Sequence, residues 1–480
     1  MKLLAAAVAA ALLVPLVAVA ASRGDGARVP STTPSFQRDV APILRQKCTG
    51  CHQVGGIAPF SLETAKQAKK WAPAIAAAVS ARVMPPWPPG PASPGYVGED
   101  SRQLTAQERS TIARWAKAGG QASGPGAGKL PAAKTEVRAG ERLLRLGMPS
   151  SYLPVAKGGA TDDYRCFLLD PKLTEDAYLT SASIVPGARS IVHHVILFRI
   201  PATAGAAAKQ ADAASPGAGW SCFGGIGVSG GPGGGDTLDN APWISAWAPG
   251  WGGSGRMPEG TGVAMPKGSL VVMQVHYNLL NGHARDRSKA VFTLAPPSPD
   301  LEAIETVLLP APVELACLKG EKGRLCDRDA AVAELGRKYG SLASFAPGVL
   351  LFICGQNAAE PKASTTSTCT RRVERPTTIR VVAGHMHLLG KSIRVELNPG
   401  TPSARVLLDI PRWDFHWQNA YQLEKPVEAK AGDIVRVTCR FEPSRRRHGD
   451  HGIPQTPRYV LWGEGTTDEM CLGLVQVTRG

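Results

Sequence analysis

The sequence predicts a multidomain protein in which a small all-α domain is followed by two mainly-β domains of the jelly-roll or β-sandwich type. At 480 residues the chain is too long for one ordinary domain. Residues 36–122 show helical patterning, whereas short alternating runs bounded by Gly, Pro and Asp begin near residue 137. The 53 glycines and 40 prolines favour turns and short strands over long helices in this second part.

Residues 1–20, MKLLAAAVAAALLVPLVAVA, have the composition of an export signal peptide. One Lys precedes a small-residue apolar run, and Ala18-Val19-Ala20 offers a cleavage site. A retained anchor is the alternative. No other apolar run approaches the roughly 20 residues that a spanning helix needs. We therefore expect an exported, periplasmic or extracellular protein without a membrane span after cleavage, with residues 21–35 as a tether.

Composition and charge argue against disorder and against a nucleic-acid partner. Hydrophobic residues make up 43% of the chain and charged residues 19%, which is typical of a globular protein. The formal net charge is +15, from 54 basic and 39 acidic residues. The densest basic run is only Arg445-Arg446-Arg447. We therefore expect the basic residues to be spread over the surface.

Three helical segments make up the first domain: FQRDVAPILRQKC, LETAKQAKKWAPAIAAAV and LTAQERSTIARWAKAGG. Thr105 precedes Glu108 by three residues, which is the spacing of a capping box at the start of the last helix. Gly119-Gly120 provides its end. The following residues, rich in Gly, Pro and Ala, indicate a linker over 123–136.

The first helical segment runs into Cys48-Thr49-Gly50-Cys51-His52, the C-x-x-C-H attachment signature of c-type haem. Cys48 and Cys51 would form thioether links, and His52 would be the proximal iron ligand. A redox dithiol or half of a zinc site is the alternative, but the adjacent His and the exported context favour haem. Met84 is the candidate sixth ligand, unless it is simply a buried methionine. Residues 36–122 therefore resemble a small cytochrome c domain.

The β region divides into two parts of similar size. Strand-like runs such as SIVHHVILFRI, GSLVVMQVHYNLL and DIVRVTCRF alternate with turn residues, as in β-sandwiches. The break LAPPSPDLEA separates domains over 137–297 and 298–480. The glycine-rich run GGIGVSGGPGGGDTLDN lacks the strand-to-helix context of a phosphate loop, so we expect a long loop there.

Five histidines lie in strand-like contexts and are candidate metal ligands. His385 and His387 stand two apart, so on one strand they share a face and can chelate one ion. His193 and His194 are adjacent, so a bulge or strand edge must bring them together; His276 is the fifth. Hydrogen-bonded core histidines are the alternative for each pair. Their combination in one exported β chain favours a metal.

The order of motifs in this region is Y-x-C, His-His, Q-x-H, H-x-H and E-M-C, the last containing Met470. In this order and combination, residues 140–480 resemble the type II copper, ascorbate-dependent monooxygenases, the family of peptidylglycine α-hydroxylating monooxygenase and dopamine β-monooxygenase. The resemblance implies two copper ions. An electron-transferring copper would be bound by His193, His194 and His276, and a catalytic, oxygen-activating copper by His385, His387 and Met470.

The donor types fit copper chemistry. Imidazole serves both copper oxidation states, thioether favours Cu(I), and three ligands leave a position for O2. Zinc is the rival for the histidines, but Met is a poor zinc ligand. The resemblance also implies that Gln274 and Tyr164 lie near the first copper and support its ligands. The alternative is that Gln274 is an ordinary polar strand residue and Tyr164 a packed aromatic side chain. The other histidines are poor candidates: His283, His448 and His451 in loops, and His416 as a core or hydrogen-bonded residue.

One departure from the family bears on the substrate. Peptide-amidating members hold a substrate carboxylate with Arg, Asn and Tyr, and the corresponding positions here are Ala383, Leu472 and Leu474. No charge remains there to bind a carboxylate. A glycine-extended peptide is therefore not the expected substrate, and an apolar or weakly polar C–H compound fits better.

The cysteines outside the haem motif number eight, enough for four disulfides in an exported chain. The family resemblance implies Cys166–Cys222 and Cys439–Cys471. For the remaining four, Cys317–Cys326 and Cys354–Cys369 close the shortest loops, and other pairings within that set stay open.

Together these features predict an exported copper-dependent monooxygenase with one covalent haem c. It would hydroxylate a C–H bond with O2, and its electrons would come through the haem from a redox protein or small reductant. The alternative is a non-hydroxylating electron-transfer or copper-binding protein. A third reading is a pair of zinc-supported structural domains.

Overall fold

The computed structural model describes residues 33–53, 58, 60–99, 103–121, 137–156, 161–223, 225–228, 238, 241–248, 255–448, 456–465 and 467–479. The expected signal peptide, most of the tether, the linker over 123–136 and His451 lie outside the described residues. Among the described residues, no helix combines the length and the apolar character that crossing a membrane requires.

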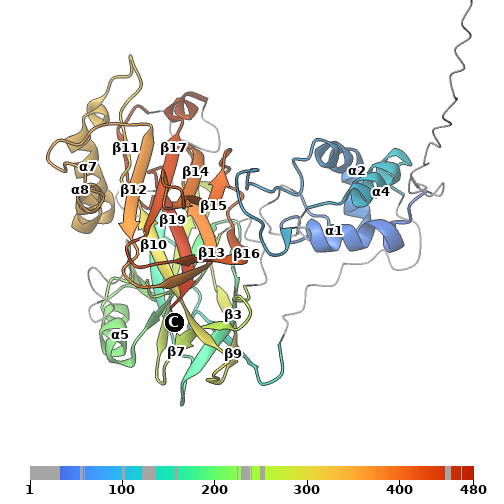
Figure 1. Cartoon of the computed structure of the whole chain (residues 1–480), viewed down its shortest axis with the longest axis horizontal. Helices are drawn as coiled ribbons and strands as arrows, with labels where there is room; N and C mark the ends of the chain where they lie inside the picture. The colour runs from blue at the N-terminus through green and yellow to red at the C-terminus, as the bar shows by residue number, and fades with distance from the viewer. Residues whose placement is uncertain are drawn as a thin grey trace, which may run out of the picture.

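The N-terminal helical unit stands to one side of the β body in Figure 1. It comprises η1 (Phe36–Val40), α1 (Ala41–Lys47), α2 (Ala65–Ser80) and α4 (Ala106–Lys117). Its core includes Leu44, Ile112 and Trp115, each fully buried. The predicted capping box is present: the Thr105 hydroxyl accepts from the Glu108 N–H (3.1 Å), and the Glu108 carboxylate accepts from the Thr105 N–H (2.7 Å). This satisfies two donors at the start of α4.

The rest of the chain is mainly β and forms two β-sandwiches. One sandwich packs the five-stranded sheet β5-β2-β8-β4-β6 against strands β1-β9-β3-β7. The strand bounds are β1 Arg142–Gly147, β2 Asp162–Leu169, β3 Ala177–Val185, β4 Val192–Ile200, β5 Trp220–Ser221, β6 Trp243–Trp247, β7 Thr261–Met265, β8 Leu270–Asn278 and β9 Lys289–Ala295.

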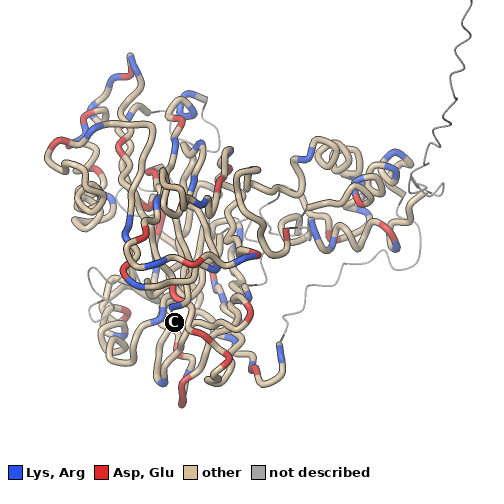
Figure 2. Tube along the Cα trace, viewed as in Figure 1, with Lys and Arg blue, Asp and Glu red and all other residues tan. Residues whose placement is uncertain are grey.

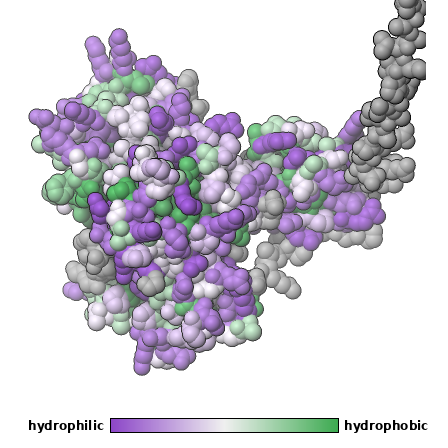
Figure 3. Space-filling model, in the orientation of Figure 1, coloured by the Kyte–Doolittle hydropathy of each residue, from purple (hydrophilic) through white to green (hydrophobic). Residues whose placement is uncertain are grey.

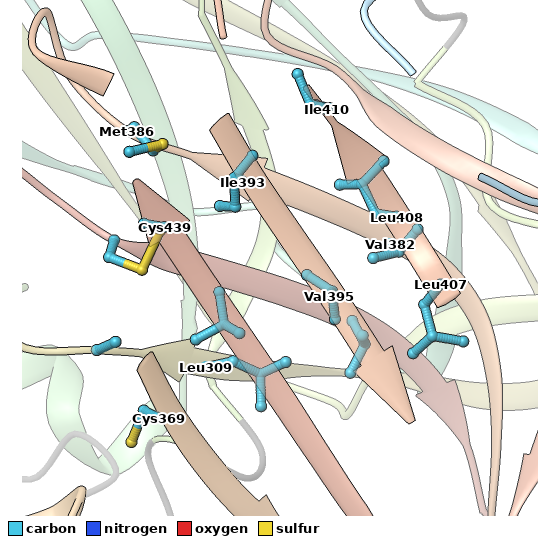
Figure 4. Close-up of a cluster of buried hydrophobic side chains, with 14 of the residues drawn as sticks. Leu309, Cys369, Val382, Met386, Ile393, Val395, Leu407, Leu408, Ile410 and Cys439 are labelled. Atoms are coloured by element: carbon cyan, nitrogen blue, oxygen red, sulfur yellow. A yellow bond between two sulfur atoms is a disulfide. The ribbon is translucent and has the colours of Figure 1, made fainter. Parts of the chain in front are cut away.

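The second sandwich packs strands β10-β19-β13-β16 against the four-stranded sheet β12-β17-β14-β15. Its core, drawn in Figure 4, includes Val382, Val395 and Leu408. Burying each such side chain contributes about 1.5–3 kcal/mol. The strands are β10 Glu302–Pro310, β12 Thr366–Arg372, β13 Thr377–His385, β14 Gly390–Leu397, β15 Arg405–Ile410, β16 Ala420–Ala429, β17 Ile434–Phe441 and β19 Leu472–Thr478, with β11 (Glu314–Leu315) and β18 (Val460–Leu461) forming a separate ribbon.

The two sandwiches share one continuous sheet of eight strands. β7 of the first pairs in parallel with β10 of the second, through Thr261 opposite Glu302 and Gly262 opposite Ala303. The chain passes between the sandwiches in the segment between β9 and β10, where the sequence break was predicted. Their relative position is therefore fixed by backbone pairing as well as by side-chain packing.

Helices also occur in the β region, which was predicted as mainly β with no particular helix assigned. α7 (Arg328–Tyr339) and α8 (Ser341–Ile353) form a pair on the outside of the second sandwich, and α5 (Gly205–Ala213) lies on the first (Figure 1). Short helical turns complete the described elements: η2 Ala202–Ala204, η3 Leu279–Asn281, η4 Arg324–Cys326 and η5 Pro443–His448.

A connecting segment of the helical unit, residues 87–97, lies against the second sandwich. The Tyr96 hydroxyl donates to the Leu407 carbonyl (2.8 Å), and the Ser93 hydroxyl donates to the Asp409 carbonyl (3.0 Å). Tyr96 also forms a β-bridge with Leu423. These contacts hold the helical unit beside β15 and β16.

Charged residues of both signs are interspersed over the two units in Figure 2. The densest basic run falls in η5, where the buried Arg446 pairs with Glu321 at 2.8 Å. The structure also joins the cysteines as Cys166–Cys222, Cys317–Cys326, Cys354–Cys369 and Cys439–Cys471. Among the described residues, Cys48 and Cys51 are the cysteines left unpaired.

Candidate metal centres

The first histidine group lies on two adjacent strands of the five-stranded sheet. His194 on β4 stands opposite His276 on β8, and the β4–β8 register shifts between Val192 and His194. This irregularity at His193 is the bulge that adjacent histidines need in order to converge. The ligand atoms of His193, His194 and His276 all lie within 4.8 Å of one another.

The Nδ1 atoms are the ones that converge. The Nδ1 of His194 is 3.2 Å from that of His193 and 3.3 Å from that of His276. Burial lowers the pKa of both His193 and His194 well below the ordinary value, so these rings are neutral, which is the metal-binding form. Three imidazole nitrogens whose atoms lie this close together are a donor set that suits copper or zinc.

Asp162 orients one of these rings from behind. Its carboxylate oxygen lies 2.8 Å from Nε2 of His276, and both side chains are buried. A carboxylate at this nitrogen fixes the ring and its tautomer, leaving Nδ1 to face a metal. Asp162 was not identified from the sequence. It stands two residues before Tyr164 on β2, so strand alternation places both on the face that carries the histidines.

Gln274 and Tyr164, for which the resemblance implied supporting roles, lie beside the first group: Gln274 on β8 with His276, and Tyr164 on the neighbouring β2. Tyr164 stands opposite His276 and stacks on its ring, with centroids 4.1 Å apart at 14°. Its hydroxyl donates to the carbonyl of Glu464 in the second sandwich. Gln274 is buried, and its amide donates to the carbonyls of Cys222 (2.8 Å) and Gly225 (2.9 Å). Gln274 therefore ties β8 to the loop after β5.

The second group departs slightly from the expected strand geometry. His385 is the last residue of β13, and His387 follows in the turn, so the pair is not a two-residue repeat within one strand. The rings nevertheless lie close, with centroids 5.1 Å apart. Met386, between them, points into the hydrophobic core and is fully buried (Figure 4).

Each of these rings has its Nδ1 occupied by a protein partner. The Nδ1 of His385 lies 2.5 Å from the Gln418 side-chain oxygen, and that of His387 lies 3.1 Å from the Asp468 carbonyl. Both Nε2 atoms are thus left for a metal. Burial lowers the pKa of His387 to about 3 and also lowers that of His385, so both rings are neutral.

Glu469 connects the histidine turn to the methionine. Its carboxylate accepts backbone N–H bonds from His387 (2.9 Å), Leu389 (2.5 Å) and Met470 (3.0 Å). Burial raises its pKa to about 8, against the effect of these donors. The E-M-C motif contained this glutamate, although its role was not predicted. Cys471, the residue after Met470, is joined to Cys439 on β17 by a disulfide.

The segment Trp413–Gln418 contacts both groups. The Phe415 ring stacks on His193 at 5.1 Å between centroids and meets His387 edge-on at 6.1 Å. The Trp413 indole donates to the His387 carbonyl (3.2 Å). This aromatic contact across the two sandwiches could not be found from strand patterning.

The remaining predicted histidines lie elsewhere or have other partners. His416 is half-buried and lies 3.3 Å from Asp414, which agrees with a hydrogen-bonded residue. His283 is exposed. The backbone of His448 ends η5, and its side chain is outside the described residues.

Both groups open onto one cavity of about 1200 Å³. His193, His194, His385 and Met470 line it. Ala383, Leu472 and Leu474 also line the cavity. These are the positions at which peptide-amidating enzymes have the Arg, Asn and Tyr that bind a substrate carboxylate. Most of the other lining side chains are apolar, which suits an apolar ligand.

The C-x-x-C-H motif forms a turn after α1. The N–H of His52 donates to the Cys48 carbonyl (2.9 Å). The Nδ1 of His52 lies 3.1 Å from the Phe60 carbonyl, which leaves Nε2 available, and both thiols are unpaired. These features fit attachment of a c-type haem. Met84, the predicted sixth ligand, lies in the segment after α2 and is half-buried.

Comparison with known proteins bears on the second group. Residues 345–476 match the family model of the copper type II ascorbate-dependent monooxygenase, C-terminal domain. This range contains His385, His387 and Met470, whereas the first group lies outside it. The match supports copper as the metal and an oxygenase-type oxidoreductase as the class of protein. No curated protein matches the chain.

Three of the solved structures that resemble this chain show weak likenesses. The major capsid protein P2 from Bacteriophage PM2 is 7% identical, with 70% of this chain and 97% of that chain covered, at a TM-score of 0.25. Allantoicase is 11% identical, with 60% and 77% covered, at a TM-score of 0.14. The infectious bursal disease virus VP2 subviral particle is 8% identical, with 73% and 75% covered, at a TM-score of 0.17. None of these supports a conclusion about function.

Proposed function

We propose that the protein is an exported copper-dependent monooxygenase that hydroxylates a C–H bond of an apolar or weakly polar small molecule. The observation that carries this proposal is that His193 and His194 of the first group and His385 and Met470 of the second line a single, mainly apolar cavity. Their partners His276 and His387 lie directly beside them. The family match over residues 345–476 supports the second set. The four disulfides support export, since such bonds persist in oxidising compartments.

Bound copper would supply O2 activation at the second set and electron storage at the first. Overall, one oxygen atom of O2 enters the C–H bond and the other leaves as water, which consumes two electrons and two protons. The protein's part is to hold the ligands and the substrate. Gln418 and Asp468 orient the two rings, and the Met470 thioether favours the reduced metal. The apolar walls around Leu472 and Leu474 bind substrate and limit water.

We further propose that electrons enter through a haem c on Cys48, Cys51 and His52. Gly50 and Cys51 line the same cavity as His193, which supports a short route from haem to the first copper. The donor would be a redox protein or a small reductant such as ascorbate. Stopped-flow spectroscopy tests this route: prereduced haem should reoxidise when copper and O2 are supplied. A haem that stays reduced would contradict the route without touching the copper chemistry.

The test of the proposed function pairs two methionines that lie in different surroundings. Met470→Leu should lower reductant-driven O2 consumption at least about 100-fold. Replacing a residue that only hydrogen-bonds to a metal ligand already costs about 10–100-fold in metal affinity or activity, and Met470 is itself a proposed ligand. Copper at the first group should remain. Met386→Leu, a change within the core, should leave both coppers and the activity in place. A screen of apolar and phenolic compounds supplies the substrate for the assay.

An outcome in which Met470→Leu consumes O2 like the unchanged protein would rule out catalysis at the second group. The protein would then fit the alternative of an electron-transfer or copper-binding protein. A protein that binds zinc and gives no copper EPR signal after copper loading would contradict both of these functions.

A further inference from the structure

Helix α8 carries an unusual apolar surface. Its sequence, SLASFAPGVLLFI, contains no charged residue. Leu342, Phe345, Val349 and Ile353 are spaced by three, four and four residues, so they form one stripe along the helix. Their exposed fractions are 64%, 67%, 54% and 41%. In Figure 3, hydrophobic residues gather at the edge of the molecule where Figure 1 places α7 and α8.

The stripe is part of the wall of the cavity that contains the two metal groups. All four stripe residues line this cavity, although solvent still reaches them. The same cavity is lined by His385 and Met470. The stripe is therefore continuous with the proposed oxygen site and is not an isolated surface patch.

The rest of α8 is firmly held, which makes the stripe a fixed wall. Leu351 is fully buried and Pro347 is also buried, so the opposite side of the helix packs against the protein. Cys354 follows the helix and is bonded to Cys369 on β12. Exposure of these large apolar side chains to water is unfavourable in free energy, so a ligand that covers them gains free energy of binding.

The chemistry of the cavity limits what can cover the stripe. The Lys, Arg, Asp and Glu side chains that line it are Arg189 and Glu464, one of each sign. Aromatic residues that also line the cavity include Phe198, Trp243 and Trp247. A volume of about 1200 Å³ exceeds the usual range for small-molecule pockets, roughly 300–1,000 Å³. These features favour a neutral, bulky and largely apolar occupant.

We propose that the stripe Leu342/Phe345/Val349/Ile353 is the outer wall of the substrate site, and that the substrate is a neutral apolar molecule larger than a single aromatic ring. This inference rests on the proposed function and adds the class of substrate to it. Small phenolic compounds would leave the stripe uncovered and would bind weakly.

Phe352 provides a matched control on the same helix. It is 77% exposed, yet it is not among the residues that line the cavity. A general docking surface on α8 would use both phenylalanines, whereas a substrate wall uses Phe345 alone.

The experiment is a fluorescence titration of the copper-free, full-length protein with the neutral apolar dye N-phenyl-1-naphthylamine. Phe345→Ala should weaken dye binding about tenfold, the effect of removing one large apolar contact. Phe352→Ala should bind like the unchanged protein. Circular dichroism of each variant confirms that it is folded, and Val349→Ala should show a smaller loss in the same direction.

Equal losses in Phe345→Ala and Phe352→Ala, or no loss in either, would overturn the proposal. Two further assays test the competing occupants of the stripe: sedimentation with phosphatidylcholine vesicles tests a lipid surface, and gel filtration tests a second copy of the chain. Binding that depends on Phe352 in either assay would also overturn the proposal. The dye assay needs no copper. Failure of Met470→Leu to lower O2 consumption would therefore refute the proposed function, while selective loss of dye binding in Phe345→Ala would still establish the apolar site.

Discussion

The buried carboxylate of Asp162 lies 2.8 Å from Nε2 of His276, on the side of the ring away from the Nδ1 atoms of His193 and His194. The ring thus has its outer nitrogen fixed by protein and its inner nitrogen directed at the candidate metal position. Carboxylates in this position hold ligating histidines in place and increase their basicity.

Asp162→Asn should therefore weaken copper binding at the first group by about 10–100-fold and leave the second group unchanged. Copper titration against a competing chelator, with integrated EPR intensity, measures both. Asp163→Asn is the control, because Asp163 lies on the other face of β2 and bonds the Tyr152 hydroxyl (2.8 Å). Equal copper affinity in both variants would show that Asp162 does not support a metal ligand.

Phe415 separates the two groups, stacking on His193 and meeting His387 with its edge. Phe415→Ala should open this space to water, so more of the consumed O2 should leave as hydrogen peroxide instead of hydroxylated product. Peroxide yield per O2 consumed should rise several-fold, and Phe415→Leu should restore most of the coupling. An unchanged yield in Phe415→Ala would mean that the ring does not control water between the groups.

The Cys439–Cys471 disulfide fixes the residue next to Met470. Replacing both cysteines with Ser should lower stability by about 2–4 kcal/mol and also remove copper from the second group. The Cys317→Ser/Cys326→Ser pair should lower stability without changing the copper content, because this disulfide lies far along the chain from the ligands. Chemical unfolding and metal analysis of both pairs distinguish the two effects.

Glu141 gives the first sandwich a pH-dependent contribution. Its hydrogen-bonded pairing with Arg256 (2.9 Å) lowers the pKa of the carboxyl to about 2, although burial opposes this. The contribution is therefore present above about pH 4.5 and is lost as the pH falls towards 2. Glu141→Gln should reduce the unfolding free energy by about 2–3 kcal/mol at pH 7.

Urea unfolding of Glu141→Gln and the unchanged protein, repeated between pH 7 and pH 2.5, measures this dependence. The difference between the two should shrink steadily below about pH 4.5. Glu175→Gln, at an exposed site, should show no difference at any pH. A constant difference for Glu141→Gln would contradict the ion-pair explanation.

Local patterns in the sequence were enough to predict many of these features. Alternation placed His276 and Gln274 on a strand, and adjacency of His193 and His194 required the irregularity that β4 contains. The capping box at Thr105 depends on neighbouring residues alone, so it too could be predicted. In each case the residues that form the pattern are the same residues, or close neighbours, as those that form the structural feature.

Features that depend on distant segments could not be predicted in this way. Phe415 and Gln418 reach the histidines from a loop with no strand or helix pattern. α8 was not predicted because both its buried side and its exposed side are apolar, so no polar face marks the helical period of its sequence. The sharing of one sheet rests on two residue pairs at the sandwich edges, which no local pattern encodes.

The parallel pairing of β7 with β10 has a consequence for producing the two sandwiches separately. Cutting the chain between β9 and β10 would free the backbone donors and acceptors that Thr261 and Glu302 now share. Each fragment would then carry a newly exposed strand edge, and such edges recruit other chains. Separate fragments should therefore aggregate, and mixing or co-expressing them should restore solubility by letting the edges cover each other.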